Sequence, residues 1–307
     1  MSEFSLKFRG VRGSYPVANK DFLKYGGNTA CVEVKVGGHI IVLDAGTGMI
    51  SVGDDLLQQH ITSAFSPQDR VPMKATVLLS HIHQDHLQGF TFFRPLHLKS
   101  TEINVFGQVC ENEDLSEEIS NILFGKSFPL DLNDIAGELK IKNLTDEQIV
   151  ILRHGCEPIV TNSIENLQSD DVVIQSYKSY AHPQDGVVIY KISSKGKTVV
   201  YANDKESYFG GEKKLIDFAK NCDVLIHDAQ YTTEDYLNQY APKQGYGHST
   251  FDMAIEVQRQ TNAEKLVFFH FDPLYNDEKL DRINSHYSNQ FPEKVLMAQE
   301  GLELEIL

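Results

Sequence analysis

Apolar residues recur along the chain in short runs, and their spacing predicts a layered arrangement of strands and helices. In the first third, runs of strand length occupy residues 4–9, 31–36 and 39–43, and Gly37-Gly38 between the last two indicates a hairpin. An amphipathic stretch from Met49 to His60 then predicts a helix. A short buried strand is expected at Ala75–Ser80.

The second half of the chain alternates apolar runs with helical stretches. Strands are expected at 187–192, 197–202, 224–226 and 265–269, with helices near 212–220, 233–239 and 250–261. Alternation of this kind is typical of α/β layers. The chain is therefore expected to form one α/β domain over residues 1–307.

Residues 111 to about 170 depart from this alternation, because they are richer in acidic and amide side chains. Within or next to this segment, Leu115–Leu123 predicts a helix, and Ile149–Leu152 and Val172–Ser176 predict strands. We interpret 111–170 as a less typical connecting segment that covers one side of a site or forms a dimer contact.

Four of the predicted strands are followed by side chains that can bind a metal or carry a proton. These side chains are His81 after 76–80, Asp204 after 198–202, His227 and Asp228 after 224–226, and His270 after 266–269. In open α/β sheets, functional sites collect beyond the carboxyl ends of the strands. A sheet built from these strands would place the polar groups along one edge.

The densest group of metal-binding side chains is the sequence His81-Ile82-His83-Gln84-Asp85-His86. Neutral imidazole and carboxylate suit zinc, iron or manganese. His81 and His83 are two residues apart and can point the same way after a strand, whereas Asp85 and His86 can face a second metal. Four polar side chains buried without partners would cost several kcal/mol, which a metal would offset.

Composition narrows the choice of function. The net charge of −15 argues against a general nucleic-acid binder, although a metal site can still attract one phosphodiester. The four cysteines are scattered without a Cys-x-x-Cys pair, which favours reduced thiols. Neither a signal peptide nor an apolar run of 18 residues is evident, so we expect a cytoplasmic protein that does not enter the membrane.

The run from Ser80 to His86 resembles the signature of the metallo-β-lactamase superfamily. Other motifs resemble the branch of that superfamily near ribonuclease Z and the cyclic-nucleotide phosphodiesterases, and they follow one another in the expected order: Gly10–Pro16, Tyr25–Cys31, Leu43–Gly48, Gly89–Phe90, Tyr201–Asp204, Ile226–Tyr231, Gly247–Thr250 and Phe269–Pro273. The resemblance implies an αββα sandwich of two mixed β-sheets flanked by helices, with metals at one edge.

The same resemblance implies the remaining metal ligands. His182 matches the third histidine of the first metal, which also takes His81 and His83. His154 is the alternative for that position, although it matches no motif. Asp204 would bridge both metals, and the second metal would take Asp85, His86 and His270. Two divalent ions are expected, with Zn²⁺ preferred over Mn²⁺ or Fe.

Further residues are expected to support catalysis. His248 matches a histidine that acts on the phosphate or the leaving oxygen in the ribonuclease Z branch, and Asp85 matches an aspartate that orients the nucleophile. Asp228 and Asp44 are expected to hold ligand histidines by their distal N–H groups. His227 should point to the opposite face of its strand and pack in the core.

These features predict a phosphodiesterase in which a metal-bridging hydroxide attacks the phosphorus of a small phosphodiester, such as a cyclic nucleotide. The acidic charge and the lack of an evident basic arm argue against a tRNA substrate. The alternatives are an acyl hydrolase acting on a lactone or thioester, and a non-catalytic metal-binding protein. A homodimer is compatible with the sequence.

Overall fold

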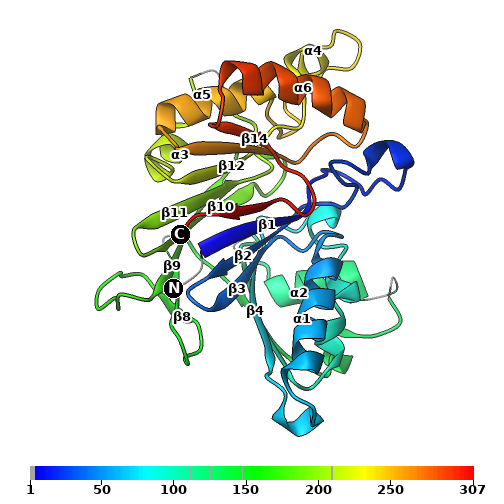
Figure 1. Ribbon diagram of the computed structural model, residues 1–307, viewed down its shortest axis with the longest axis vertical. Coiled ribbons are helices and arrows are strands. Elements are labelled where there is room, and N and C mark those ends of the chain that lie inside the picture. The colour runs from blue at the N-terminus through cyan, green and yellow to red at the C-terminus, as the bar shows by residue number, and fades with distance from the viewer. Residues whose placement is uncertain (1–3, 111, 125, 127, 147, 209) are drawn as a thin grey trace.

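The computed structural model describes residues 4–110, 112–124, 126, 128–146, 148–208 and 210–307 (Figure 1). Two β-sheets lie face to face, and helices cover the outer side of each (Figure 1). The expected αββα sandwich of two mixed sheets is therefore confirmed.

The first sheet has seven strands among the described residues, and its two halves differ in direction. In spatial order these strands are β15 (Glu303–Glu305), β1 (Phe4–Gly10), β2 (Cys31–Val36), β3 (His39–Leu43), β4 (Met73–Leu78), β5 (Thr101–Gly107) and β6 (Glu138–Asn143). The pairs from β15 to β3 are antiparallel, and those from β3 to β6 are parallel. The parallel strands bring their carboxyl ends to one edge.

The second sheet has eight strands in the described part of the chain and is divided in the same way. Its order is β14 (Val295–Met297), β13 (Lys265–Phe269), β12 (Val224–Asp228), β11 (Lys197–Ala202), β10 (Val187–Ser194), β9 (Val172–Ser179), β7 (Ile149–Leu152) and β8 (Ile159–Thr161). Strands β11 to β14 are parallel, and the pairs from β11 to β8 are antiparallel.

Two apolar cores hold the layers together. One joins the inner faces of both sheets and continues to α5 (Phe251–Thr261) and α6 (Asp277–Gln290); the other lies between the first sheet, α1 (Met49–Ser63) and α2 (Leu115–Ile119). The shorter helices α3 (Lys213–Phe218) and α4 (Thr233–Tyr236) lie on the side of the second sheet (Figure 1). Within the described residues, no helix combines the length and apolarity needed to cross a bilayer.

Most expected elements form, but two expectations need correction. The strand expected at Ala75–Ser80 is β4 at Met73–Leu78, so Leu79 and Ser80 already belong to the loop that leads to His81. The segment 111–170 is more than a connection, because it contributes β6 to the edge of the first sheet and β7 and β8 to the second. The remaining strands that the sequence pattern did not predict, β5, β14 and β15, complete the sheets.

Candidate metal centre

Four strands bring the candidate site residues to one edge of the sandwich. β11, β12 and β13 are parallel and in register, with Ala202 beside His227 and Asp228 beside Phe269. Asp204 and His270 follow the ends of β11 and β13, and the loop after β4 carries the histidine cluster from His81. The sequence expectation that these side chains share an edge is thus met in the structure.

Three of the site residues adopt a left-handed backbone conformation directly after a strand. The φ angles are 60° at Asp44, 47° at Asp204 and 65° at His270. Non-glycine residues rarely adopt this conformation, which costs of order 1–3 kcal/mol and persists where the surrounding structure enforces it. In each case, the turn occurs at the point where the strand reaches the edge that carries the site.

The first group of possible ligands consists of His81, His83 and His182. Their ligand atoms lie within 4.8 Å of one another, and Nε2 of His182 is 3.2 Å from Nδ1 of His83. His81 and His182 are buried, and His83 is partly exposed. The alternative, His154, is exposed on a turn after β7 and lines a different cleft.

The second group consists of Asp85, His86, Asp204 and His270, all of which are buried. Nε2 of His86 and Nε2 of His270 are 3.3 Å apart, and each lies 3.3 Å from Oδ2 of Asp85. The backbone N–H of Ser14 donates to the same Asp85 oxygen at 2.7 Å. The loop that precedes β2 therefore contributes to the site.

Asp204 lies between the two groups, with one carboxylate oxygen facing each. Oδ1 lies 3.9 Å from Nε2 of His81 and 4.0 Å from Nε2 of His182. Oδ2 lies 3.1 Å from Nε2 of His86 and 3.2 Å from Nε2 of His270. A carboxylate in this position can give one oxygen to each of two cations.

The donor atoms fit metal ions better than they fit one another. Nδ1 of His86 is occupied by Asp44, which leaves Nε2 to present a lone pair towards His270 and two carboxylates. Nε2 of His81 and Oδ2 of Asp204 are buried without a hydrogen bond. Converging electron pairs of this kind are costly unless a cation binds them. The buried histidine and aspartate groups are therefore consistent with a dinuclear metal site.

The pKa values also respond to this concentration of groups. Burial would raise the pKa of Asp204, but His270, His86 and His81 hold it well below its ordinary value. Burial would lower the pKa of His270, but Asp204, Asp228 and Asp85 raise it to about 10. Burial, followed by the neighbouring His86, lowers the pKa of His81 well below its ordinary value. Without cations, the three carboxylates thus draw protons onto the imidazole of His270.

Asp44 holds one of the candidate ligands from outside, as expected. Its Oδ2 accepts hydrogen bonds from Nδ1 of His86 at 2.9 Å, from the hydroxyl of Tyr201 at 2.7 Å and from the hydroxyl of Ser80 at 2.9 Å. Its Oδ1 accepts from the N–H of Ser80 at 2.7 Å. Tyr201 was not predicted to take part, since nothing in the sequence distinguishes it from a core tyrosine.

Asp228 holds His248 more closely than it holds a candidate ligand. Its Oδ2 lies 2.8 Å from Nδ1 of His248 and 3.5 Å from Nδ1 of His270. The two imidazoles are stacked, with ring centroids 5.2 Å apart. His248 and Asp228 also form a possible metal-binding group with Asp204 and His270, but Nδ1 of His248 is already engaged by Asp228. His227 is buried, as expected, and its Nδ1 lies 2.7 Å from the carbonyl of Asp228.

Comparison with known proteins agrees with this geometry. A family model described as a beta-lactamase superfamily domain matches residues 39–271, which is more than half of the chain. The chain belongs to the metallo-β-lactamase superfamily. Ribonuclease Z of Picrophilus torridus is 26% identical over 313 residues, covering 91% of this chain and 89% of the relative.

Solved structures of the superfamily share the fold at lower sequence identity. A diphosphatase from the PhnP family is 15% identical, with a TM-score of 0.65, and covers 99% of this chain and 98% of the other. Yeast PDE1 is 15% identical, with a TM-score of 0.60, and covers both chains completely. The protein is therefore a member of the superfamily related to ribonuclease Z and to PDE1 and PhnP diphosphatases.

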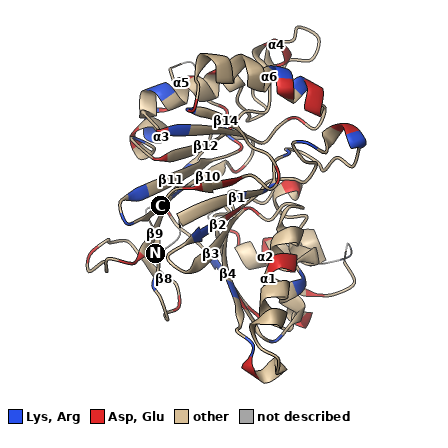
Figure 2. Ribbon diagram, in the orientation of Figure 1, with Lys and Arg blue, Asp and Glu red and all other residues tan. Residues whose placement is uncertain are grey.

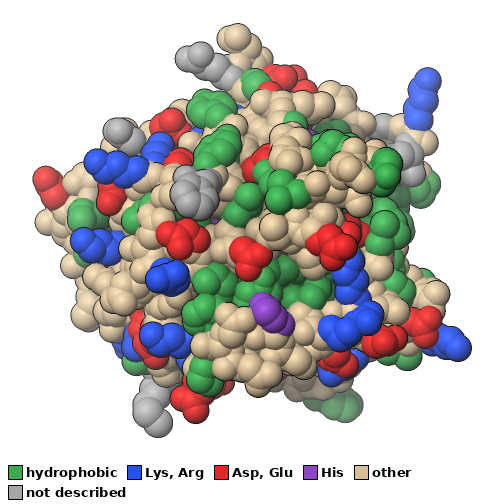
Figure 3. All heavy atoms as spheres, turned by 90° about the horizontal axis from the view of Figure 1, so that it is seen from above, with side chains coloured by type: hydrophobic (Ala, Val, Ile, Leu, Met, Phe, Trp, Pro, Cys, Tyr) green, Lys and Arg blue, Asp and Glu red, His purple; other side chains and the backbone are tan. Residues whose placement is uncertain are grey.

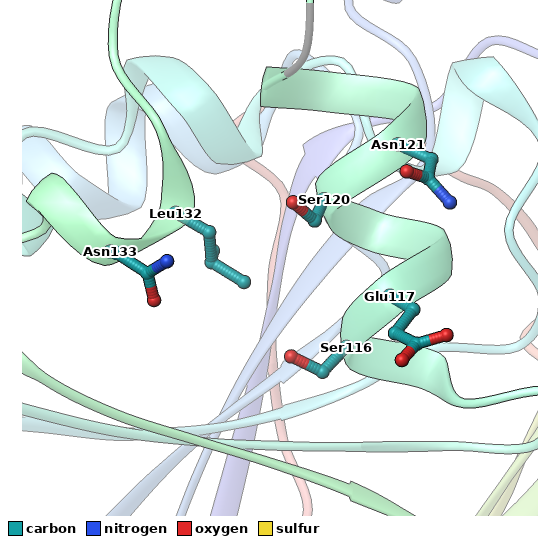
Figure 4. A pocket seen from close by; sticks show the side chains of 6 residues that line it. All are labelled: Ser116, Glu117, Ser120, Asn121, Leu132 and Asn133. Carbon is teal, nitrogen blue, oxygen red and sulfur yellow. The ribbon is translucent and has the colours of Figure 1, made fainter.

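Two clefts lie away from the metal centre of this superfamily member. One, of about 300 Å³, lies between α2 with the π-helical turn Ser120–Phe124 and the segment around Leu132, and Figure 4 shows Ser116 and Ser120 on one side and Leu132 and Asn133 on the other. The other, of about 740 Å³, includes His39, His60 and His154. None of the candidate metal ligands lines either cleft.

Proposed function

We propose that the protein is a dinuclear metal-dependent phosphodiesterase that acts on a small phosphodiester. One cation would be held by His81, His83 and His182, and the other by Asp85, His86 and His270, with Asp204 between them. The observation that carries the proposal is the placement of the two Asp204 oxygens, each within 4.0 Å of two histidines of a different group. The preferred metal is Zn²⁺, with Mn²⁺ or Fe as alternatives.

Two cations at these ligands would supply a water nucleophile at neutral pH and a Lewis acid for the phosphoryl oxygens. The protein's own part is to place the ligands and to handle protons. Asp85 is fixed by the N–H of Ser14, so its carboxylate can orient the attacking group. Asp44 holds the imidazole of His86 in one tautomer through Nδ1.

His248 is proposed to stabilise or protonate the departing oxygen. Asp228 accepts a hydrogen bond from its Nδ1, which leaves Nε2 to act on the substrate. The imidazole is 9% exposed and lies beside His270, so it belongs to the wall of the metal centre. A group at this place can donate a proton to a leaving oxygen without being a metal ligand.

The charge distribution favours a small diester over a long nucleic acid. The chain carries a net charge of −15, and Figures 2 and 3 show basic residues scattered among acidic and apolar ones. One cation lies near the proposed acid, because Nζ of Lys243 is 5.8 Å from the ring centroid of Tyr231, which is 6.0 Å from that of His248. Lys243 is proposed to attract the substrate phosphate.

Turnover of bis(p-nitrophenyl) phosphate by Zn²⁺-loaded protein tests the proposal. We expect turnover in the wild type and none above background in His83→Ala, which loses one proposed ligand. A lactone and a ribonuclease Z substrate, a tRNA precursor, are assayed in parallel. Turnover of the lactone alone would identify an acyl hydrolase. Cleavage of the tRNA precursor with no turnover of small diesters would overturn the choice of substrate.

A further inference from the structure

Glu206 is a buried carboxylate near the metal centre with no part in the function proposed above. It lies two residues after Asp204 and is 7% exposed. Its Oε1 accepts from the N–H of Gly245 at 2.9 Å and from the hydroxyl of Tyr236. Its Oε2 accepts from the N–H of Gly245 at 3.0 Å and from the N–H of Gly247 at 3.1 Å. One side chain therefore binds both glycines of the loop before His248.

That loop positions two residues of the proposed site. The carbonyl of Gly247 lies 3.0 Å from Nδ1 of His182 and fixes the orientation of that imidazole. His248 follows directly in the chain. Gly245 and Gly247 have φ angles of 80° and 86°, so glycine is favoured at both positions. The loop conformation brings their N–H groups to the Glu206 carboxylate.

The backbone around Glu206 makes further ties to the same two segments. Its N–H donates to the carbonyl of Ala181 at 3.0 Å, next to His182. The N–H of Ser207 donates to the hydroxyl of Ser249 at 2.9 Å. The segment after Asp204 is therefore hydrogen-bonded on one side to the loop with His182 and on the other to the loop with His248.

The partners of Glu206 are neutral, which distinguishes it from a structural ion pair. No salt bridge within 4.0 Å involves Glu206 among the described residues, and the neighbouring Lys205 pairs with Glu212 instead. A carboxylate that accepts several N–H groups forms stronger hydrogen bonds than a neutral amide can. A glutamine would also turn an NH₂ group towards backbone N–H donors.

We propose that Glu206 is a positioning residue that fixes His182 and His248 relative to Asp204 by holding the Gly245–Gly247 loop. This inference rests on the proposed function for the roles of the two histidines. It does not rest on phosphodiesterase activity for the placement of the loop. The two claims can therefore fail separately.

The test compares Glu206→Gln with Glu33→Gln, a control of similar burial. Glu33 is 3% exposed and pairs with Arg9 in the first sheet, away from the site. Three quantities are measured: amide hydrogen exchange of residues 243–249 in metal-free protein, Zn²⁺ affinity by chelator competition, and kcat and KM for bis(p-nitrophenyl) phosphate. Melting temperatures of both variants measure the general loss of stability.

Glu206→Gln is expected to speed exchange in the loop and to weaken Zn²⁺ binding by about ten- to a hundred-fold. It should lower kcat by at least about ten-fold, in line with the cost of misplacing a proton donor, with little change in KM. Glu33→Gln should leave loop exchange and Zn²⁺ affinity unchanged. Tyr236→Phe, which removes one donor of the same carboxylate, should have a smaller effect in the direction of Glu206→Gln.

The inference is overturned if Glu206→Gln matches the wild type in loop exchange and Zn²⁺ affinity, or changes them no more than Glu33→Gln does. If Glu206→Gln does not fold, Glu206→Asp and Tyr236→Phe decide, because both must then loosen the loop without a comparable fall in melting temperature. If wild-type protein hydrolyses no diester, exchange and Zn²⁺ affinity still test the positioning role.

Discussion

The carboxylate of Asp44 lies 2.9 Å from Nδ1 of His86, which is 42 residues further along the chain. Both side chains are fully buried. The same carboxylate accepts from the hydroxyl of Tyr201, which comes from the other sheet. One aspartate at the end of β3 thus links the two layers and fixes the tautomer of a proposed ligand.

Asp44→Asn should weaken Zn²⁺ binding by about ten- to a hundred-fold, because the amide cannot accept hydrogen bonds from all four donors. Each donor left unpaired costs about 1–3 kcal/mol, so the free energy of unfolding should also fall. Chelator competition and urea unfolding measure the two effects. Tyr201→Phe serves as the control, since it leaves His86 held. Unchanged Zn²⁺ affinity in Asp44→Asn would contradict the role of Asp44.

His248→Ala should lower kcat by about 10²- to 10⁴-fold while KM and the bound metal stay close to wild type. The reason is that His248 is proposed to act on the leaving oxygen rather than to bind a cation. Asp228→Asn should lower kcat in the same direction but by less, since it only loosens the imidazole. Steady-state kinetics with metal analysis checks both. Loss of one metal in His248→Ala would show that His248 is a ligand.

Gly247→Ala should disrupt the site, whereas Gly245→Ala should not. A Cβ at Gly247 would lie 2.3 Å from Nδ1 of His182 and 2.3 Å from Cδ of Pro183, but a Cβ at Gly245 meets nothing within 4 Å. Both glycines have positive φ, so both variants carry a left-handed penalty of about 1–2 kcal/mol. Zn²⁺ affinity should fall in Gly247→Ala alone. Equal affinities in the two variants would rule out the steric argument.

The fold was largely predictable because buried strands and amphipathic helices leave a local pattern. Strands β5, β14 and β15 were missed, although Ile103, Val105 and Val295 are buried, since short runs with alternating polar residues carry a weak signal. The segment 111–170 was underestimated because β6 and β7 belong to different sheets. Such long-range pairing has no local signature.

The candidate ligands could be predicted because metal-binding side chains at strand ends are a dense signal. The residues that hold them could not. Ser14 binds Asp85 through its backbone N–H, and Gly247 binds His182 through its carbonyl, so their side chains give no indication. Glu206 is an ordinary glutamate in sequence, and only the folded loop shows which groups it binds.

His227 should make stability depend on pH, because burial lowers its pKa from 6.5 to about 4. The unfolded chain then binds the proton more tightly than the native protein does. The stabilisation is fully present above pH 6.5 and is lost as the pH falls towards 4, by up to about 3 kcal/mol. Urea unfolding of metal-free wild type and His227→Gln at pH 7 and pH 4 measures the difference. Equal losses in the two proteins would contradict the shift.

The count of metal ions per chain tests the central claim most directly. Protein dialysed against buffered Zn²⁺ is analysed by mass spectrometry, as wild type, His83→Ala, His270→Ala and Asp204→Asn. Cys110→Ser, which alters a separate cluster of possible ligands with Glu113 and Asp185, is the control. We predict two Zn²⁺ ions in the wild type and in the control, and fewer in each of the three site variants. Fewer than two ions in the wild type, or an unchanged count in the site variants, would contradict the account.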